Sequence, residues 1–161
     1  AQREVSDYYG ELLAVNFDGS KSKYLFGYNS DTSASTKIKS NGGIQATAFV
    51  LDTLKDDKDD ILVMAYPWNK QNYTYTEVYR VDVYSGKRKR LTTSPVANAG
   101  FLVDNNENVR FSFARDKKNN DQLFYYENDE WVDAERIKGG LTDFYPLSFT
   151  EDNKSIYDMG K

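Results

Sequence analysis

Apolar and polar residues between Ala46 and Pro95 follow the pattern of four consecutive β-strands. The first candidate strand, 46–54, is apolar at its centre and stops at the charged turn KDDKDD. The second, Ile61–Tyr66, is an unbroken apolar run of six residues, which fits a buried strand and is too short for an ordinary helix. A third strand is predicted over 77–83 and a fourth over 87–92.

The third of these strands alternates between apolar and polar side chains, which is typical of a strand with one buried face. One side of the strand is expected to carry Tyr79, Val81 and Val83, and the other side Arg80 and Asp82. Ser85-Gly86 predicts a tight turn after this strand. Four antiparallel strands joined in this order form a meander, which is the unit of one blade of a β-propeller.

The same pattern repeats further along the chain. Four more strands are predicted, separated by the polar turns DNNEN, DKKNND and NDE, over 97–103, 109–115, 122–127 and 131–137. Another unit begins at Phe144 and contains the hairpin PLSFTEDNKSIY. The second strands of the three units start near Ile61, Val109 and Ile156, so the spacings are 48 and 47 residues. A repeat of this length indicates a propeller.

A shorter hairpin precedes these units. Its two strands are predicted over 11–17 and 23–28, with a turn at Asp18-Gly19. The layout of this hairpin, ELLAVNFDGSKSKYLFG, resembles that of EVYRVDVYSGKRKRLTT. We therefore assign this hairpin to the last half of a blade. The next segment, 29–43, is rich in Ser, Thr, Asn and Gly, which predicts a long connection.

The chain is therefore predicted to be all-β, a partial β-propeller of about three blades that are four-stranded antiparallel meanders. Its single domain, 1–161, divides into a half blade at 8–28, blades at 46–95 and 97–138, and a half blade at 144–160. A closed propeller needs at least about four blades, so we expect the chain to be part of a larger protein. Open blade edges favour a homo-oligomer. The apolar residues expected at those edges are Leu12, Ala14, Leu25, Phe149 and Ile156.

Composition narrows the classes of function. Among the 161 residues, 13 Tyr and 9 Phe favour strands over helices. The net charge of −4 is modest and spread along the chain, which argues against a nucleic-acid partner. No apolar run approaches the roughly 18 residues of a membrane helix, so no membrane partner is expected. The polar start AQREVSDYYG lacks the signal-peptide pattern, and the location is left open between periplasm and cytoplasm.

Two residue types that carry much of enzyme chemistry are missing from the sequence. The absence of Cys excludes disulfides and thiolate metal sites, and the absence of His excludes a His-based catalytic triad and His-ligated metals. The 25 acidic residues include no pair that stands out as a catalytic acid and base. We therefore assign no catalytic, cofactor-binding or metal-binding residue from the sequence.

Two charged stretches each have two interpretations. KRKR, Lys87–Arg90, fits a nuclear-localisation or nucleic-acid patch, but charges on the outer strand of a blade also prevent edge-to-edge aggregation, and we favour the latter. Oxygen ligands for a hard cation are offered by Asp56, Asp57, Asp59 and Asp60. This stretch lacks the Gly and the distal Glu of an EF-hand loop, so a solvated turn is favoured, as for Asp104–Asn108 and Glu151–Asn153.

An aromatic loop is predicted between the second and third strands of the first full blade, and it contains Pro67, Trp68, Tyr73 and Tyr75. An exposed aromatic loop can bind a peptide or a partner domain, whereas the alternative that we favour is packing over the adjacent blade. Asn72-Tyr73-Thr74 and Asn153-Lys154-Ser155 fit the short N-glycosylation pattern, which matters only in a secretory pathway.

These residues resemble a known family. VLDTLKDDKDDILVMAY followed by EVYRVDVYSGKRKRLT is similar to the propeller of bacterial prolyl oligopeptidase-type serine peptidases, including their acylaminoacyl- and dipeptidyl-peptidase-like members. PLSFTEDNKSIY is similar to the blade openings of the same propellers. The likeness covers nearly the whole chain, and such blades also resemble those of Tol-system periplasmic propellers.

The resemblance implies a cap without an enzyme. In the family, a C-terminal α/β-hydrolase domain carries the Ser, Asp and His triad, and the propeller admits only short peptides to the active site. The present chain has no G-x-S-x-G elbow and no His, so no catalytic residue of the family is carried over to it. The implied partners are the hydrolase domain, the remaining blades and short peptide substrates. The alternative is a protein-binding propeller of the Tol-system kind with no enzymatic role.

Overall fold

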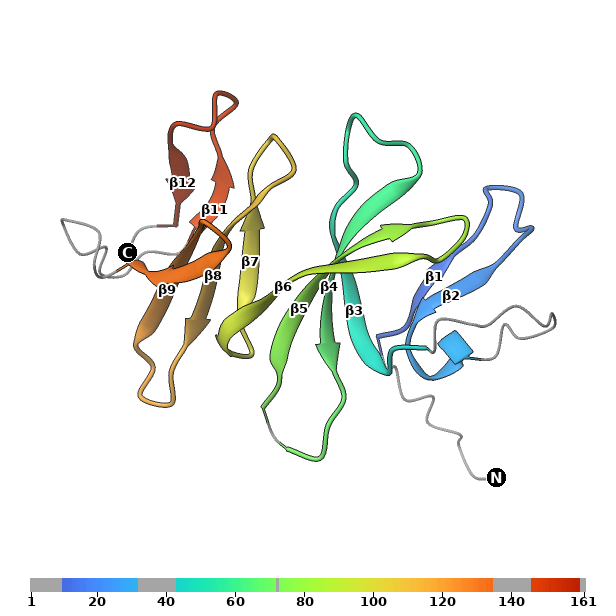
Figure 1. The fold of residues 1–161 in the computed structure, drawn as a ribbon, viewed down its shortest axis with the longest axis horizontal. Coiled ribbons are helices and arrows are strands. Elements are labelled where there is room, and N and C mark those ends of the chain that lie inside the picture. Colours follow the sequence, from blue (N-terminus) through green and yellow to red (C-terminus); the bar gives the residue numbers. More distant parts are fainter. Residues whose placement is uncertain (1–9, 32–42, 72, 135–145, 160–161) are drawn as a thin grey trace.

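The computed structural model describes residues 10–31, 43–71, 73–134 and 146–159, and in these residues the chain is all-β (Figure 1). The 3-10 turn η1 (Tyr28–Asp31) follows β2. The strands are β1 (Leu12–Ala14), β2 (Lys23–Phe26), β3 (Ala46–Asp52), β4 (Asp60–Pro67), β5 (Tyr75–Asp82), β6 (Arg88–Ala97), β7 (Gly100–Val103), β8 (Val109–Arg115), β9 (Asp121–Glu127), β10 (Glu130–Asp133), β11 (Pro146–Phe149) and β12 (Ile156–Asp158).

Every sheet pairs strands in the order in which they occur along the chain. β3-β4-β5-β6 and β7-β8-β9-β10 are four-stranded meanders, and β1-β2 and β11-β12 are two-stranded hairpins. All pairs in the described residues are antiparallel. The two predicted meanders and the two predicted hairpins are therefore confirmed. The part of the connection predicted over 29–43 that spans 32–42 lies outside the described residues.

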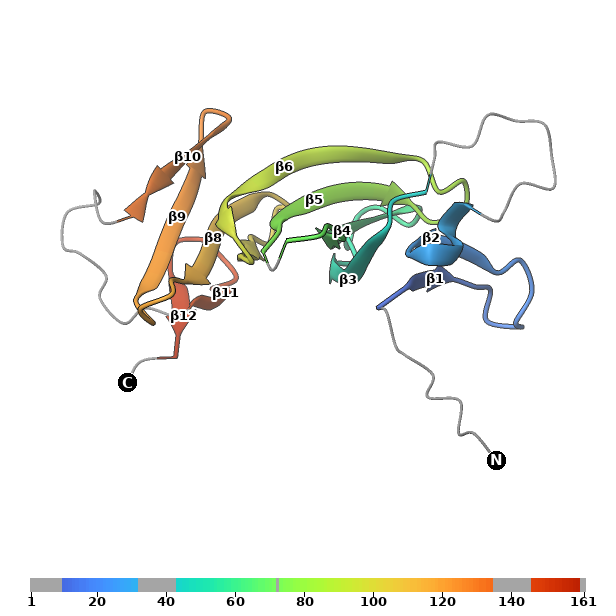
Figure 2. The ribbon, with the colours of Figure 1, turned by 90° about the horizontal axis from the view of Figure 1, so that it is seen from below.

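The sheets stand side by side, and each touches the next one along the chain. β1 and β2 contact β3, β3 contacts β7, and β7 contacts β11. Figure 2 shows β6 and β10, the last strands of the two meanders, along one side of the molecule, with β1, β11 and β12 toward the opposite side. The first strands of successive sheets are thus neighbours, and the last strands of the two meanders lie along the other side of the molecule.

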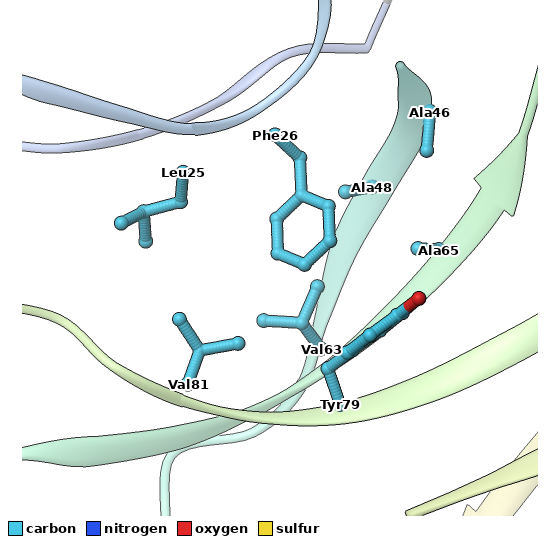
Figure 3. Packing of buried hydrophobic residues seen from close by; sticks show 8 residues of the cluster. All are labelled: Leu25, Phe26, Ala46, Ala48, Val63, Ala65, Tyr79 and Val81. Atoms are coloured by element: carbon cyan, nitrogen blue, oxygen red, sulfur yellow. The ribbon is translucent and has the colours of Figure 1, made fainter. Parts of the chain in front are cut away.

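The first core lies between the β1–β2 hairpin and the β3–β6 sheet. Phe26 is fully buried there, and its ring meets the ring of Tyr79 edge-on at 5.5 Å (Figure 3). The buried residues of this cluster are Leu25, Phe26, Ala46, Ala48, Val63, Ala65, Tyr79 and Val81. Small side chains on β3 and β4 leave room for the Phe26 ring, so the hairpin packs closely on the sheet.

The opposite face of the β3–β6 sheet is buried as well. Val78 is fully buried and packs with Phe101 and Val109 of the next sheet. Trp131 of β10 joins this second cluster and donates its indole N–H to the Thr93 carbonyl over 2.8 Å. Neighbouring sheets are therefore joined by apolar contacts that one sheet alone could not supply.

The alternation predicted for the third strand is confirmed only in part. Tyr79 and Val81 of β5 do face the first core, but Val83 lies beyond the end of β5. The side of β5 expected to be polar also carries the fully buried Thr76 and Val78, because the next sheet packs against it.

The residues expected at open edges are mostly covered, which corrects that prediction. Leu25 is buried, and Leu12 and Ala14 pack against the first core. Phe149 is half-buried, and its ring lies 6.0 Å from that of Phe111. The exposed apolar side chains of the two hairpins are others, namely Leu13, Val15, Phe17, Tyr24, Leu147, Tyr157 and Met159. The prediction took these residues to face missing blades, whereas Leu12, Ala14 and Leu25 pack on the β3–β6 sheet.

Five hairpin turns of the described residues share one backbone hydrogen bond. In each, the first turn residue receives a bond from the residue three positions later, and these first residues are Asn16, Leu54, Asp104, Asp116 and Thr150. The β5–β6 turn differs, because Asp82 receives its bond from Gly86, four positions later. Two of the like turns are also joined, since the Asn105 side chain donates to the Thr150 carbonyl over 2.7 Å. The β1–β2 turn thus shares this bond with the β3–β4, β7–β8, β8–β9 and β11–β12 turns.

The first core predicts the effect of shortening one phenylalanine. Phe26→Ala removes a fully buried ring, so we expect the free energy of unfolding to fall by about 3–5 kcal/mol. Phe17→Ala is the matched control, because that ring is fully exposed at the β1–β2 turn, and its effect should stay within about 0.5 kcal/mol. Urea unfolding followed by tryptophan fluorescence measures both. Equal midpoints for the two variants would show that the hairpin is not part of the cooperative unit.

Candidate functional site

The loop between β4 and β5, residues 68–74, is held against the first strand of its own sheet. The backbone N–H of Trp68 donates to the Gln45 carbonyl over 2.9 Å, and its indole Nε1 donates to Thr47 Oγ1 over 3.0 Å. Figure 1 shows this loop and the β8–β9 turn at the same edge of the molecule. Because both polar groups of Trp68 are tied to the segment that enters β3, its ring has a fixed position.

Side-chain amides shape the rest of the loop. The Asn69 side chain accepts the Gln71 N–H over 2.8 Å and donates to the Tyr73 carbonyl over 3.1 Å. Asn98, in the turn between β6 and β7, accepts the Thr74 N–H over 3.2 Å and donates its own backbone N–H to the Thr74 carbonyl over 2.7 Å. The loop is therefore fixed at its start, its centre and its end.

A cavity of about 410 Å³ opens between this loop and the neighbouring strands, and we call it the loop cavity. Its walls combine aromatic rings with amide and hydroxyl groups and contain no charged side chain. The lining residues are Thr47, Tyr66, Pro67, Trp68, Asn69, Gln71, Tyr73, Thr74 and Asn98. Such walls suit a neutral ligand that has both apolar surface and hydrogen-bonding groups.

A second cavity, of about 490 Å³, lies where the β3–β6 and β7–β10 sheets meet, and we call it the inter-sheet cavity. Its only charged lining residues are Arg115 and Asp121, which pair with each other at 2.8 Å. Its lining residues are Met64, Tyr66, Asn98, Gly100, Phe101, Phe113, Ala114, Arg115, Asp121 and Gln122. Tyr66 and Asn98 line both cavities, so the two are adjacent, and together we call them the groove.

Gly100 has a specific role in the wall of the inter-sheet cavity. A Cβ atom at this position would lie 2.9 Å from Cζ of Phe113, closer than carbon atoms approach one another. The missing side chain therefore lets the Phe113 ring lie over the start of β7.

The aromatic residues predicted as a loop are divided by the structure. Pro67, Trp68 and Tyr73 are brought together in the loop cavity. Tyr75 instead begins β5, is half exposed and lines neither cavity. The sequence interpretation missed Asn98 and Phe113, which come from the β6–β7 turn and the next sheet. The only sequence signal at Asn98 is the short polar break between two strand patterns.

The acidic turn before β4 is tied to a cation of the protein itself. Arg80 binds Asp57 through Nη2 at 2.5 Å and Asp60 through Nε at 2.6 Å. Two groups hold the pKa of the Asp57 carboxyl below its usual value: the backbone N–H of Asp59, which has the larger effect, and the Arg80 guanidinium. Asp56 and Asp59 point into solvent. In the described ranges, no group of three or more acidic side chains lies close enough together to hold a metal ion.

The other two acidic turns are also built from internal hydrogen bonds. Asp104 is buried and accepts the N–H groups of Asn106 and Asn108 over 2.9 and 3.0 Å, and Arg110 lies 3.1 Å from its second oxygen. The side chain of Asn153, the second glycosylation candidate, accepts the Asn105 backbone N–H over 2.9 Å. The first candidate, Asn72, lies outside the described residues.

The KRKR stretch lies at the outer edge of its sheet, as predicted. Arg88, Lys89 and Arg90 belong to β6, the last strand of the meander, and Lys87 precedes it. Arg88 donates to the Leu25 carbonyl over 2.9 Å and lies over the Phe26 ring, 5.5 Å from its centre. This arginine therefore connects the edge strand to the first hairpin.

The described residues contain no helix that is long and apolar enough to cross a membrane. No protein-family model matches the chain, and neither the curated proteins nor the solved structures contain a significant match to it.

A partly buried polar network lies next to the first core. The Tyr79 hydroxyl donates to Glu77 Oε2 over 2.6 Å, and Arg90 pairs with the other oxygen of Glu77 at 2.7 Å. The pKa of the Tyr79 hydroxyl is raised well above its ordinary value. Burial is the larger cause, and the hydrogen bond to the Glu77 carboxylate is the second. The folded protein therefore keeps this proton at a pH where the unfolded chain has lost it.

This network predicts a loss of stability in alkali. Above about pH 10 the unfolded state binds fewer protons than the folded state, so the contribution of Tyr79 makes the free energy of unfolding fall as the pH rises. Tyr79→Phe should show a shallower fall than the parent chain between about pH 8 and about pH 11, measured by urea unfolding. Tyr84→Phe, which removes the hydroxyl of an exposed tyrosine, is the control. Identical slopes for Tyr79→Phe and the parent chain would contradict this assignment.

Proposed function

We propose that the four sheets are successive blades of a β-propeller, and that this propeller is the non-catalytic, substrate-gating cap of a prolyl oligopeptidase-type serine peptidase. The observation that carries the fold proposal is the contact of β3 with β7 and of β7 with β11. First strands of consecutive meanders meet in this way when blades are arranged around a common axis. The resemblance of the sequence to the propellers of prolyl oligopeptidase-type peptidases is the reason for proposing this family.

The β1–β2 hairpin finds a place in this arrangement. Both of its strands contact β3, and its turn has the hydrogen-bond pattern found in the first and second turns of the meanders, whereas the β5–β6 turn, the last of its meander, differs. The turn pattern favours the first strands of a blade over the last two, which the sequence layout had favoured. The homo-oligomer expected from open edges stays a prediction.

A gating role without catalysis fits the chemistry of the chain. The sequence contains no His to serve as a general base, and the walls of the groove hold amides, hydroxyls and aromatic rings beside one internal ion pair. Such a surface can select what passes or binds, but it lacks an activated nucleophile.

The second candidate function is a protein-binding propeller of the Tol-system kind. The observation that favours it is the groove itself, which is open to solvent and lies at the loop edge of two sheets. Loops carried on a rigid sheet scaffold are common recognition surfaces. In this case polypeptide binding would be the whole function of the protein.

The two candidates differ in what the gene encodes next to this segment. A peptidase requires further strand repeats and then an α/β-hydrolase domain with a G-x-S-x-G elbow and a later His. Sequencing the complete reading frame tests this directly. A frame that closes the propeller and encodes no such elbow would overturn the peptidase assignment and favour the binding protein.

The chain on its own is predicted to hydrolyse nothing. Chromogenic aminoacyl and dipeptidyl substrates should show no turnover above buffer, because no histidine is present to activate a serine. The complete protein, assayed in parallel, provides the positive control. Turnover by the pure chain that a serine-reactive phosphonate abolishes would contradict the non-catalytic role.

A further inference from the structure

We propose that a cavity between the β1–β2 hairpin and the β3–β6 sheet binds a small anionic amphiphile, a molecule with an apolar chain and one carboxylate group. We call it the hairpin cavity. The apolar chain would lie in the cavity, and the carboxylate would lie beside Lys21. This inference goes beyond the proposed function and does not depend on it, because it uses no property of a peptidase or of the groove.

The hairpin cavity has a volume of about 660 Å³ and lies where the hairpin meets the end of the sheet. Figure 1 shows the β1–β2 hairpin beside the β5–β6 turn, and Lys23 of β2 donates to the Ser85 carbonyl of that turn. All described lining residues are apolar or aromatic except Asn16 and Lys21. Sites for small molecules have volumes of about 300–1,000 Å³ and mostly apolar walls, so both features fit such a site.

The cavity extends from an exposed rim to a buried floor. Its floor contains the buried Leu25, together with Leu12 and Ile61, which pack against the first core. The exposed apolar residues of the rim are Leu13, Val15, Phe17, Val50 and Tyr84. Apolar side chains exposed singly are ordinary, whereas several around one opening indicate a binding surface. An apolar ligand would gain free energy by covering these side chains and excluding water from the floor.

Lys21 provides the only charge in the described wall of the cavity. It forms no ion pair with any carboxylate in the part of the chain that the structure describes. The acidic side chains of the two adjoining turns are used internally. Asp18 accepts the Ser20 N–H and hydroxyl over 2.9 and 2.6 Å, and Asp82 accepts two backbone N–H groups of its own turn. The ammonium group of Lys21 is therefore the group that can receive a ligand anion.

The backbone of Lys21 gives a second reason to assign it a role in binding. Its φ angle is 51°, in the left-handed region that residues with a side chain seldom adopt. Gly or Asn would occupy this position with less strain. Residues held in strained conformations are concentrated at binding sites, so a lysine at this position supports a use for its side chain.

The walls select an amphiphile over other small ligands. A purely polar anion such as phosphate would gain nothing from the apolar rim and floor. A neutral apolar molecule would fill the cavity but would leave the Lys21 charge without a partner. A cationic amphiphile would place like charges side by side. A carboxylate with an apolar chain satisfies both the walls and the charge.

The alternative occupant is the surface of another protein, including a second copy of the chain. A flat surface would cover the rim but would leave the floor at Leu25 unfilled, with a loss of packing contacts. The concave shape and the Lys21 charge therefore favour a small ligand. A protein occupant is one of the outcomes of the test.

The test is a titration of the ¹⁵N-labelled chain with decanoate at about pH 7, where its carboxyl group is ionised. We expect saturable shifts of amide signals from residues 12–17, from Lys21 and from the β5–β6 turn. The matched probes are decanol, which is neutral, decylammonium, which has the opposite charge, and octanoate, which has a shorter chain. All are kept below the concentrations at which they form micelles. Decanol and decylammonium should bind at least about threefold more weakly than decanoate, and octanoate about tenfold more weakly.

Variants at Lys21 separate its charge from its place in the turn. Lys21→Asn removes the charge but suits the left-handed backbone. The preference for decanoate over decanol should therefore fall to less than about twofold, while the free energy of unfolding should not fall. Lys21→Arg keeps the charge and should keep the preference. Lys118→Asn, at an exposed lysine of the β8–β9 turn, is the matched control and should leave the preference unchanged.

Variants of the rim locate the apolar chain of the ligand. Phe17→Ala and Tyr84→Ala remove exposed rings and should weaken the binding of decanoate and of decanol alike, by about threefold or more. Tyr157→Ala removes an exposed ring of β12 outside the cavity and should change binding by less than about twofold. Because all three side chains are exposed, these variants should fold as the parent chain does.

Several results would overturn the inference. They are the absence of saturable decanoate binding, equal binding of decanoate and decanol by the parent chain, and an unchanged preference in Lys21→Asn. Light scattering accompanies the titration. A dimer that Phe17→Ala or Tyr84→Ala dissociates, and that decanoate leaves intact, would assign the rim to a second copy and would also overturn the inference. None of these outcomes bears on the hydrolase domain, whose presence is decided by sequencing the reading frame.

Discussion

Burial of both faces of the β3–β6 sheet is the constraint on which the rest of the structure depends. One face covers the β1–β2 hairpin through Phe26 and Tyr79, and the other covers the next sheet through Val78 and Phe101. A sheet with two apolar faces has to lie between two neighbours. This need fixes the side-by-side order of the sheets, and the order in turn brings the β4–β5 loop next to the β6–β7 turn. The groove is therefore a result of core packing, although none of its hydrogen bonds belongs to the core.

Local sequence signals were sufficient for strands bounded by clear turns. The predicted bounds of β8 agree with the observed ones because an alternating apolar pattern lies between the polar turns DNNEN and DKKNND. β6 extends further than predicted, to Ala97, although TTSP has the composition of a turn. The reason is that Ser94 Oγ accepts the Thr76 N–H over 2.9 Å, next to Pro95, which has no N–H of its own to pair. The Ser94 side chain therefore replaces a backbone hydrogen bond between β5 and β6, and strand propensities do not include such side-chain bonds.

Features that depend on how sheets meet could not be predicted from the sequence. Val78 lies on the same side of β5 as Arg80 and Asp82, which were expected to face solvent, and it is buried because the next sheet packs there. The aromatic loop was correctly located, but its partners Asn98 and Phe113 come from segments whose approach is decided by sheet packing. The acidic turn is similar, because Arg80 lies 20 or more residues along the chain from Asp57 and Asp60 yet becomes their partner through the β4–β5 register. Sequence can propose the chemistry of such groups, whereas tertiary contacts determine what they bind.

The strictly sequential pairing of strands has a mechanical consequence. Each described strand pairs only with its neighbours along the chain, and the main contacts of each described sheet are with the sheets beside it. A force applied to the two ends would therefore peel hairpins open one hydrogen-bonded pair at a time, instead of shearing many bonds at once. The resistance met would be low and stepwise, with one step for each sheet that separates from its neighbour. In a molecular machine that threads or pulls on polypeptides, such a chain would yield progressively from its ends and keep the remaining sheets intact.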